Sequence, residues 1–387
     1  MKIIHDSTPF PDYHRTQASK PPWMDIDFWP CRWISYDPNP EEPIVAAYRL
    51  AFRWEHERSV KLHVSADERY ELYLDGRRIG RGPERGHVKG WYYDTYQVEL
   101  TQGEHTLTAR VWSFKDKRPW AQMTLSPGFI LAPDDIELVP LLGTGAADWR
   151  VRKLEGYTLI DMPATYNGTG AKLEIDGSRF PWGFASPDAD TDDAAWTKPE
   201  IGEAGNNGFS QLTFRSVRLM RPAALPAQLE AAIDLGGVTI RHIESFESQA
   251  VLEERPILAA NHQADEEESW YAWLREGRPL QIAPGRRLRV LLDLGDYCCL
   301  YPELTVSGGN GAAITLSWQE SLYSEPNGAG KGHRGEVEGK YFCRKVGDRF
   351  LLDGGERRTY ETLWWHAGRY AELVVETAAE PVVLHGL

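Results

Sequence analysis

The chain has 387 residues and a formal net charge of -14 at pH 7, so nucleic acid and an anionic membrane surface are poor partners. No segment reaches the roughly eighteen apolar residues of a membrane span, and the first twenty residues lack the apolar core of a signal peptide. The four cysteines do not have the paired spacing of a metal site. We therefore expect reduced thiols, a cytoplasmic location, no metal site and no cofactor.

The first strong pattern along the chain is a set of short strand-like runs. They begin with "AAYRLAFRW" (46–54) and "VKLHV" (60–64) and recur to the end, separated by Gly, Pro, Asn and Asp. Alternating apolar and polar residues over such short lengths are typical of strands that bury one face. This spacing favours antiparallel sandwiches over a parallel sheet with crossover helices.

Residues 70–86, "YELYLDGRRIGRGPERG", raise the question of a phosphate-binding loop, because glycines and four arginines follow a strand-like run. Such a loop leads into a helix, whereas residues 91–100 are rich in Trp, Tyr and Val and favour a strand. Asp75-Gly76 is a dipeptide that accepts the positive φ angles of a tight hairpin turn. We predict a β-hairpin with structural arginines, and treat sugar contact as the alternative.

The remaining pattern predicts an all-β fold of two antiparallel β-sandwich domains joined by a Pro-rich linker, with minor helix. The first sandwich is expected over residues 1–220, with a turn-rich excursion near 143–210. "RPAALPAQ" marks a linker at 221–235, and the second sandwich follows at 236–387. Helical spacing of apolar residues is clearest in "ESWYAWLREG" (268–277).

Two features bear on chemistry. The chain contains 15 tryptophans, a load that suits either sandwich cores or aromatic platforms for sugars. The glycine-flexible loop "GAGKGHRGEVEGKYF" crowds charges of both signs, which packing alone does not require. We therefore take as candidates for contact with carbohydrate or with another domain His333, Arg334, Glu336, Glu338 and Trp364.

Several segments, in order, resemble one family. "ADERYELYLDGRRIGRGPERG", "WYYDTYQVELTQGEHTLTARVW" and "TDDAAWTKPE" resemble the N-terminal β-sandwich region of bacterial α-L-rhamnosidases. "LLDLGDYCCLYPELTVSGGNGAAITLSWQESLY", "KGHRGEVEGKYF" and "DRFLLDGGERRTYETLWWHAGRYAELVVE" resemble their second β-sandwich. The specificity lies in the ordered set, because any one of these pieces is a weak signal.

This resemblance implies an accessory, non-catalytic region. In that family the general acid and base lie on a helical barrel that follows the sandwiches, so the barrel is the expected partner and rhamnosides are possible ligands. Two alternatives stay open: a stand-alone carbohydrate-binding protein, and a self-contained glycosidase that uses Glu336 and Glu338. We also expect Cys298 and Cys299 to be buried thiols on the strand "LRVLLDLGDYCCL".

Overall fold

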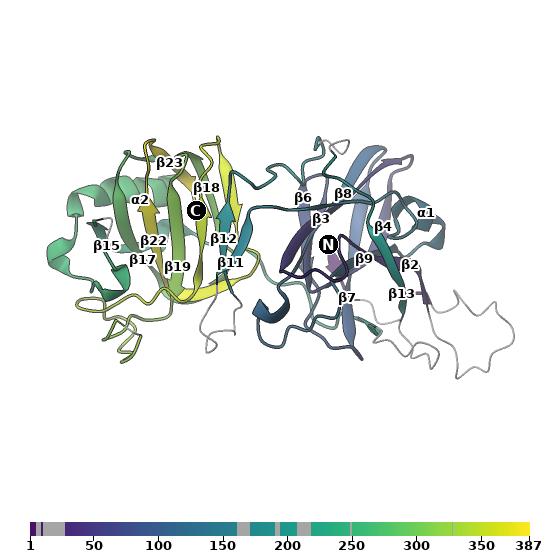
Figure 1. The fold of residues 1–387 in the computed structure, drawn as a ribbon, viewed down its shortest axis with the longest axis horizontal. Helices are drawn as coiled ribbons and strands as arrows, with labels where there is room; N and C mark the ends of the chain where they lie inside the picture. The colour runs from purple at the N-terminus through teal and green to yellow at the C-terminus, as the bar shows by residue number, and fades with distance from the viewer. Residues whose placement is uncertain are drawn as a thin grey trace. The chain divides into compact units, whose positions relative to one another are not determined.

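The computed structural model confirms an all-β protein, with 48 % of residues in strands and 9 % helical. Most strand pairs are antiparallel, and the exceptions among the described residues are β12 with β20 and β14 with β7. Figure 1 shows the strands gathered into two bodies. The structure describes residues 1–4, 9–10, 28–160, 171–189, 194–206, 218–247, 250–326 and 328–387.

The chain divides into two compact units whose boundaries do not follow the sequence in order. Unit 1 comprises Met1–Glu155 and Gly183–Glu230, and unit 2 comprises Gly156–Trp182 and Ala231–Leu387. The sequence pattern predicts an excursion of the first sandwich near residues 143–210. The structure differs because, within that range, β12 (Lys172–Asp176) pairs with β20 (Gly347–Leu351) of unit 2 and β11 (Tyr157–Ile160) pairs with β12.

Unit 1 is a sandwich of two sheets. The order in the larger sheet is β1 (Lys2–Ile3), β7 (Trp91–Leu100), β4 (Arg58–Asp67), β9 (Gly128–Pro133), β2 (Phe28–Ser35) and β13 (Glu200–Asn206), with β14 (Met220–Pro222) also on β7. The order in the smaller sheet is β10 (Arg150–Lys153), β3 (Ile44–Trp54), β8 (Gly103–Ser113), β5 (Arg69–Leu74) and β6 (Arg77–Gly82). A short helix, α1 (Val139–Leu142), packs against β9 and β3.

The larger sheet of unit 1 is buried on both faces. Its inner face packs on the smaller sheet through alternate residues such as Leu62 and Val64. Its outer face carries an aromatic cluster that includes Trp29, Trp91 and Tyr93. Aromatic rings therefore fill two layers of this unit, and much of the tryptophan content serves packing.

The hairpin predicted at residues 70–86 is present. β5 pairs with β6 across a turn in which Asp75 and Gly76 have φ angles of 50° and 76°. The later glycines have another role: a Cβ at Gly80 would lie 2.2 Å from the Tyr96 ring, and one at Gly82 would lie 1.9 Å from Asp94 Oδ2. Glycine therefore allows side chains of the facing sheet to lie directly against β6.

Unit 2 is also a sandwich of two sheets. The larger has the order β11 (Tyr157–Ile160), β12 (Lys172–Asp176), β20 (Gly347–Leu351), β19 (Ala313–Gln319), β22 (His366–Glu376), β17 (Arg287–Leu300) and β15 (Thr239–Ser245). The smaller has the order β16 (Leu280–Ile282), β23 (Val382–Gly386), β18 (Glu303–Gly308) and β21 (Arg358–Glu361). On β18, Leu304 and Val306 are buried while their neighbours are not, so this sheet buries one face.

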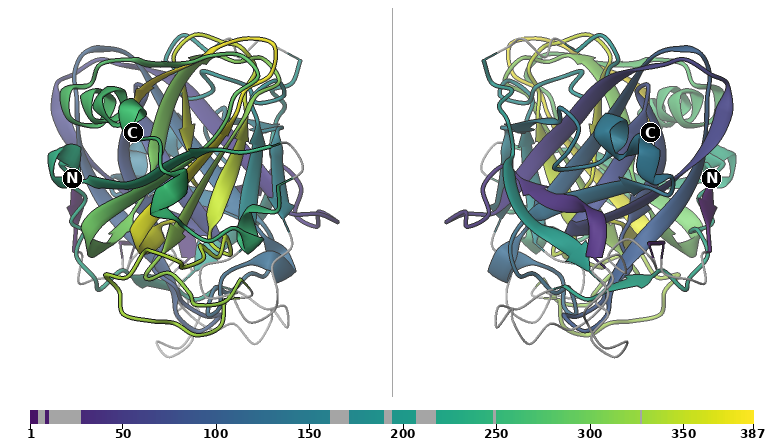
Figure 2. Two further views of the ribbon diagram at one scale, coloured as in Figure 1. Left: turned by 90° about the vertical axis from the view of Figure 1, so that its left-hand side faces the viewer. Right: turned by 90° about the vertical axis from the view of Figure 1, so that its right-hand side faces the viewer.

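The predicted helix is α2 (Glu267–Glu276), which ends at Gly277 in the left-handed conformation. Trp270, Trp273 and Leu274 form its buried side. α2 contacts β16 and β15, which are edge strands of the two sheets, and so closes one edge of the sandwich (Figure 2).

Successive residues 288–292 of β17 are all buried, so the larger sheet of unit 2 is covered on its outer face as well. The cover comes from two segments near residues 257 and 322–342. They contribute Ile257, Leu322, Val337 and Phe342 to a cluster with residues of β17 and β22. These covering segments carry most of the candidate residues.

All four cysteines are free thiols, as expected, but the prediction that Cys298 and Cys299 are buried is wrong. Cys298 is half-buried and Cys299 is exposed. The pairing of β17 with β22 shifts register between Asp293 and Cys298, where Gly295 has a φ of 80°. The strand leaves the core at this irregularity, so the two cysteines lie beyond its buried part.

Candidate functional site

A cleft of about 550 Å³ lies on the outer side of the larger sheet of unit 2. This volume is within the range of small-molecule sites. One wall is β15, and the other is the loop that contains Glu336 and Glu338. The lining residues are Thr239, Ile240, Arg241, His242, Ile257, Ala259, His262, Gly335, Glu336, Val337, Glu338 and Lys340.

The β15 wall exposes consecutive residues to the cleft because the strand is irregular. In a regular strand, neighbouring side chains point to opposite faces. The pairing of β15 with β17 shifts between Ile240 and His242, which leaves Arg241 as the extra residue of a bulge. Ile240, Arg241 and His242 therefore all line the cleft.

The opposite wall is fixed by backbone hydrogen bonds. Ile257 N donates to Lys340 O at 2.8 Å, and Gly339 N donates to Ile257 O at 2.7 Å. Ala259 N donates to the Glu338 carboxylate at 2.9 Å, and Val337 is anchored in the apolar cluster beneath. The loop thus holds Glu338 in one orientation at the rim.

His242 lies at the base of the cleft and is 0 % exposed. Its Nε2 makes a 3.4 Å ion-pair contact with Glu244 Oε2. Neither Nε2 nor Nδ1 has a hydrogen-bond partner among the residues that the structure describes. Buried ring nitrogens without a partner are costly, so this imidazole is a specific feature of the site.

His262 has a defined tautomer. Ile243 N donates to its Nδ1 at 3.1 Å, so Nδ1 is the acceptor. Its Nε2 is 3.0 Å from the Glu267 carboxylate and must then carry the proton. His262 therefore joins β15 to the first residue of α2 and is positioned beside the cleft.

A buried ion cluster supports the β15 wall, and we call Glu244, Arg289, Glu372, Arg344 and Arg255 the unit 2 cluster. Arg289 Nε donates to Glu372 at 2.6 Å, and its Nη1 is 3.2 Å from Glu244. Burial by itself would raise the pKa of Glu244, but His242 and the charge of Arg289 outweigh it and hold the pKa at about 2. Glu244 is thus ionised beneath His242.

The candidate residues from sequence do not all meet at the cleft. Glu336 and Glu338 line it, whereas Arg334 and Lys331 form ion pairs with Glu320 outside it. Those cations lower the pKa of Glu320, chiefly through the hydrogen bond from Lys331. His333 is exposed and also lies outside the lining.

Trp364 is also placed away from the cleft. It is 6 % exposed and stacks on Trp365, with ring centroids 6.2 Å apart. Its ring therefore packs inside unit 2. Trp120, 61 % exposed, is the single exposed tryptophan in the part of the chain that the structure describes. An aromatic platform for sugars would need several such rings.

Arg241, His242 and His262 were missed by sequence reasoning. The eleven histidines looked scattered, and nothing in "TIRHIES" distinguishes a bulged strand from a regular one. Among the described residues, no group of three or more His, Cys, Asp or Glu side chains is placed to hold a metal ion. No helix in the described part of the chain is long and apolar enough to cross a membrane.

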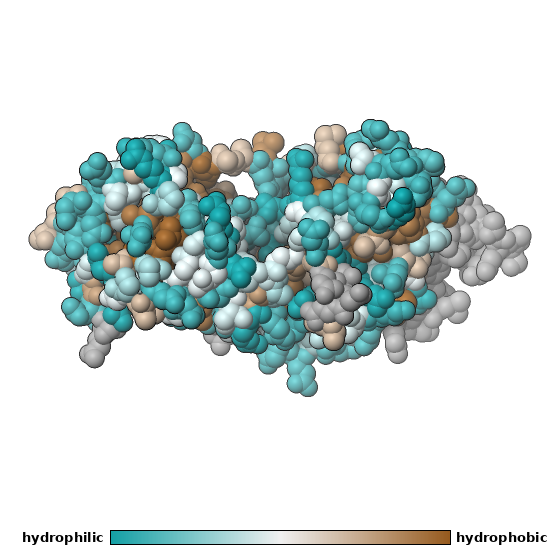
Figure 3. Space-filling model, turned by 90° about the horizontal axis from the view of Figure 1, so that it is seen from above, coloured by the Kyte–Doolittle hydropathy of each residue, from teal (hydrophilic) through white to brown (hydrophobic). Residues whose placement is uncertain are grey.

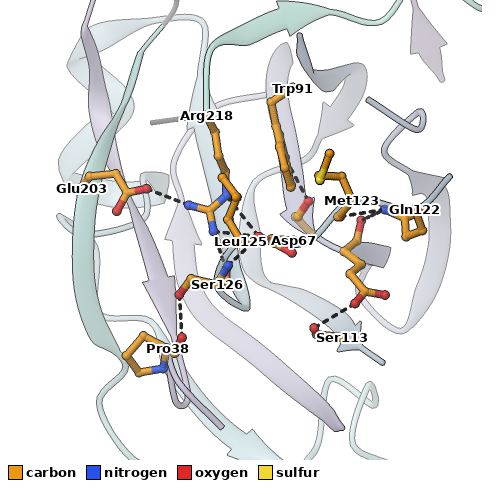
Figure 4. A network of polar contacts seen from close by, with 12 residues as sticks. Pro38, Asp67, Trp91, Ser113, Gln122, Met123, Leu125, Ser126, Glu203 and Arg218 are labelled. Carbon is orange, nitrogen blue, oxygen red and sulfur yellow. Dashed lines mark hydrogen bonds and ion pairs between the residues drawn. The ribbon is translucent and has the colours of Figure 1, made fainter. Parts of the chain in front are cut away.

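Unit 1 contains a polar network of a different kind (Figure 4). The Arg218 guanidinium lies over Trp33 and Trp91, 4.3 and 5.2 Å from the ring centroids, and donates to Asp67 at 2.8 Å. Asp67 also accepts from the backbone N of Leu125 and Ser126. The network thus ties the residue two positions before β14 and the 125–126 loop to β4, which indicates a structural role.

The arginines of the 70–86 hairpin also serve structure. Arg81 Nε donates to Glu71 at 2.8 Å, and Arg110 Nε donates to the other oxygen of Glu71 at 2.8 Å. We call Glu71, Arg78, Arg81 and Arg110 the unit 1 cluster. Burial would raise the pKa of Glu71, but these three arginines lower it to about 2.

Comparison with known proteins gives structural neighbours only, because no family model and no curated protein matches the chain. It is similar to the GH78 rhamnosidase of Bacillus sp. GL1, with a TM-score of 0.65 and 14 % identity over 93 % of this chain and 54 % of that chain. The fold is shared with part of that enzyme. The α-L-rhamnosidase from Aspergillus terreus gives a TM-score of 0.52 and 13 % identity over 91 % of this chain and 36 % of that one.

The chain thus spans about half the length of the first rhamnosidase and about a third of the second. At these identities the match concerns the fold. It agrees with the arrangement of sandwiches that the sequence resemblance implied.

Proposed function

We propose that this chain is an accessory, non-catalytic region of an α-L-rhamnosidase-like glycoside hydrolase. Its role is to support a helical-barrel catalytic domain and to border the carbohydrate cleft of that enzyme. The supporting observation is the fold match to the Bacillus sp. GL1 rhamnosidase, which takes in 93 % of this chain and 54 % of that one. A near-complete match to part of a larger enzyme is what an accessory region would give.

The surroundings of the carboxylates in the candidate loop also support a catalytic site on another domain. Inverting glycoside hydrolysis uses a carboxylic acid kept protonated by an apolar site, with a second carboxylate opposite. Glu336 is 55 % exposed at its side chain and paired with Lys340 at 3.2 Å, and Glu338 is also exposed. We therefore assign the acid and base to the partner domain.

The exposed candidates then serve contact with that partner. His333 and Arg334 are exposed, and Arg334 is 59 % exposed although it pairs with Glu320. A cytoplasmic location fits the free state of all four thiols.

The first test is genetic: we expect a helical catalytic domain to be encoded in the same gene or in a neighbouring one. The second is biochemical: the rhamnosidase activity and the thermal midpoint of the assembled enzyme should fall when residues 1–387 are removed. Arg334→Ala should lower the midpoint of the assembled enzyme. Arg278→Ala is the matched control and should not, because Arg278 is also an exposed, ion-paired arginine, with 72 % of its side chain accessible.

Two results would overturn this function. One is turnover of a chromogenic α-L-rhamnoside by residues 1–387 alone, lost in Glu336→Gln or Glu338→Gln. The other is an assembled enzyme whose activity and thermal midpoint do not change when residues 1–387 are deleted.

A further inference from the structure

We propose that the cleft between β15 and the 335–340 loop binds a neutral, polyhydroxylated ligand of pyranose size. The choice of a sugar as the ligand rests on the proposed function. The position of the site rests on the geometry of the cleft alone. Its contacts would come from Arg241, Glu338 and Lys340 at the rim and from His242 at the base.

The charges of the cleft favour a neutral ligand. Two cations, Arg241 and Lys340, face two carboxylates, Glu336 and Glu338, so neither an anion nor a cation gains a net attraction. Lys340 is 3.2 Å from Glu336, which neutralises both locally. His262 is committed to Ile243 and Glu267 and adds no open donor.

The open hydrogen-bonding atoms suit hydroxyl groups, which both donate and accept. Arg241 makes one 3.3 Å hydrogen bond to Gly335 O and a 3.7 Å contact with Asp293, so most of its donors are available. Glu338 uses Oε2 for Ala259 N and leaves Oε1 as an acceptor. Adjacent hydroxyls of a pyranose can bridge such a donor and acceptor.

The base of the cleft supplies the apolar surface and the atom that lacks a partner. Ile240, Ile257 and Val337 line the cleft with 4 %, 2 % and 9 % of their surface exposed, so they offer a small aliphatic area to the C–H face of a ring. His242 Nδ1 is buried at this base without a partner among the described residues. A ligand hydroxyl that reached Nδ1 would satisfy it.

The site is also pre-organised. Glu338 is held by Ala259 N, and the loop is held by its pairing with Ile257. A ligand therefore meets side chains that are already ordered, which lowers the entropic cost of binding.

The experiment is a titration of the isotopically labelled chain with L-rhamnose, following the imidazole resonances of His242 and His262 by NMR. We expect both to shift with a dissociation constant around millimolar, the range for a monosaccharide in an open site. D-glucuronate and D-glucosamine, of similar size but charged, should bind no more tightly.

Two variants test the assigned contacts. Arg241→Gln and Glu338→Gln should each weaken binding about tenfold. Arg278→Gln, an exposed arginine outside the lining, should leave it unchanged. Glu338→Gln keeps an amide oxygen for Ala259 N, so a change in binding is not a change in loop structure, and unchanged backbone spectra verify this.

Three results would overturn the inference: no shift of either imidazole at 100-fold the expected constant, tighter binding of a charged sugar, or rhamnose binding that neither variant weakens. Failure here is distinct from failure of the proposed function. If the chain supports a catalytic domain but does not bind sugar, only the proposed sugar site is refuted. If the chain binds sugar but has no catalytic partner, only the proposed accessory role is refuted.

Discussion

The unit 1 and unit 2 clusters each bury a glutamate among arginines, but they differ in how completely that glutamate is hydrogen-bonded. In unit 1, Glu71 accepts from Arg81 and Arg110 at 2.8 Å each and from Tyr73 at 2.9 Å. Segment 183–189 covers it, with Phe184 against Tyr73 and Arg110. The carboxylate is satisfied entirely by this chain.

In unit 2 the same kind of cluster borders an open cleft. Glu244 makes only longer contacts, 3.2 Å to Arg289 and 3.3 Å to Arg255, and His242 above it lacks a partner for Nδ1. The comparison teaches that a buried ion cluster by itself does not mark a site. A buried group without a hydrogen-bond partner beside a cleft is the stronger candidate.

Exposed hydrophobic residues on the surface likewise do not mark a site by themselves. On the face seen in Figure 3, hydrophobic residues of each unit form separate patches among hydrophilic ones. Exposed large hydrophobic side chains such as Trp120 and Leu229 lie on different segments of the described chain. Single exposed apolar residues of this kind are ordinary, so the cleft is the stronger feature.

The largest expected effect is on unit 1. Glu71→Gln should destabilise the protein by about 3–5 kcal/mol, because it leaves Arg110 buried without its counter-charge. The measurement is urea unfolding followed by tryptophan fluorescence. Glu104→Gln, on β8 of the same sheet but 71 % exposed, is the control and should change little. Similar losses in both variants would contradict a closed cluster.

A second test uses pH and the enclosed Glu68 of unit 1. Burial raises its pKa to about 8, against hydrogen bonds from Ser113 and the backbone of Phe114 and Lys115 that favour the ionised form. Between the unfolded pKa near 4.5 and about 8 the folded chain binds the extra proton, so this group's contribution falls as pH rises, by at most about 1.4 kcal/mol per pH unit. Glu68→Gln should flatten that slope in unfolding curves. An identical slope in both proteins would show that Glu68 is not enclosed.

The matching substitution in unit 2 should cost less. Glu244→Gln is expected to lower stability by about 1–3 kcal/mol, because Arg289 keeps its 2.6 Å bond to Glu372. The wild-type pKa of about 2 lies below the unfolded value, so the stability that Glu244 contributes is present above pH 4.5 and is lost toward pH 2. Acid unfolding of the variant should therefore be shallower. A loss equal to that of Glu71→Gln would remove the distinction between the clusters.

The smallest effect concerns thiol chemistry and leaves stability unchanged. In native protein, Cys299 should react first with a thiol reagent and Cys298 more slowly. Cys343 and Cys31 are buried and should react only on unfolding, and burial raises the pKa of Cys31 to about 12. Mass spectrometry of the modified peptides checks the order. Labelling of Cys31 at the rate of Cys299 would show that unit 1 opens as readily as the exposed end of β17.

Sequence reasoning predicted what local patterns encode. Asp75-Gly76 gave the hairpin turn, and the apolar spacing near residues 268–277 gave α2. The close contacts that require glycine at positions 80 and 82 could not be predicted, because they are made by side chains from β7. The exposure of Cys299 was also out of reach, because it follows from a register shift that leaves no trace in the apolar pattern.

For the candidate site, the loop composition identified Glu336 and Glu338 but not their neighbours. His242 lies almost a hundred residues earlier, and it reaches the cleft through sheet order and a bulge in β15. Long-range pairing of this kind is set by the whole fold, so a single sequence shows one wall of the site at most.

The parallel pairing of β12 with β20 also has a consequence for synthesis. Leu173 N donates to Asp348 Oδ1, and these residues are 175 positions apart. At translation rates of about 5–20 residues per second, β12 leaves the ribosome roughly 10 to 35 seconds before its partner strand exists. During that interval unit 1 can fold around a long loop, whereas the larger sheet of unit 2 must wait for nearly the whole chain. A nascent chain stalled before residue 347 should therefore leave β11 and β12 open to proteases, and to capture by chaperones that bind unpaired strands.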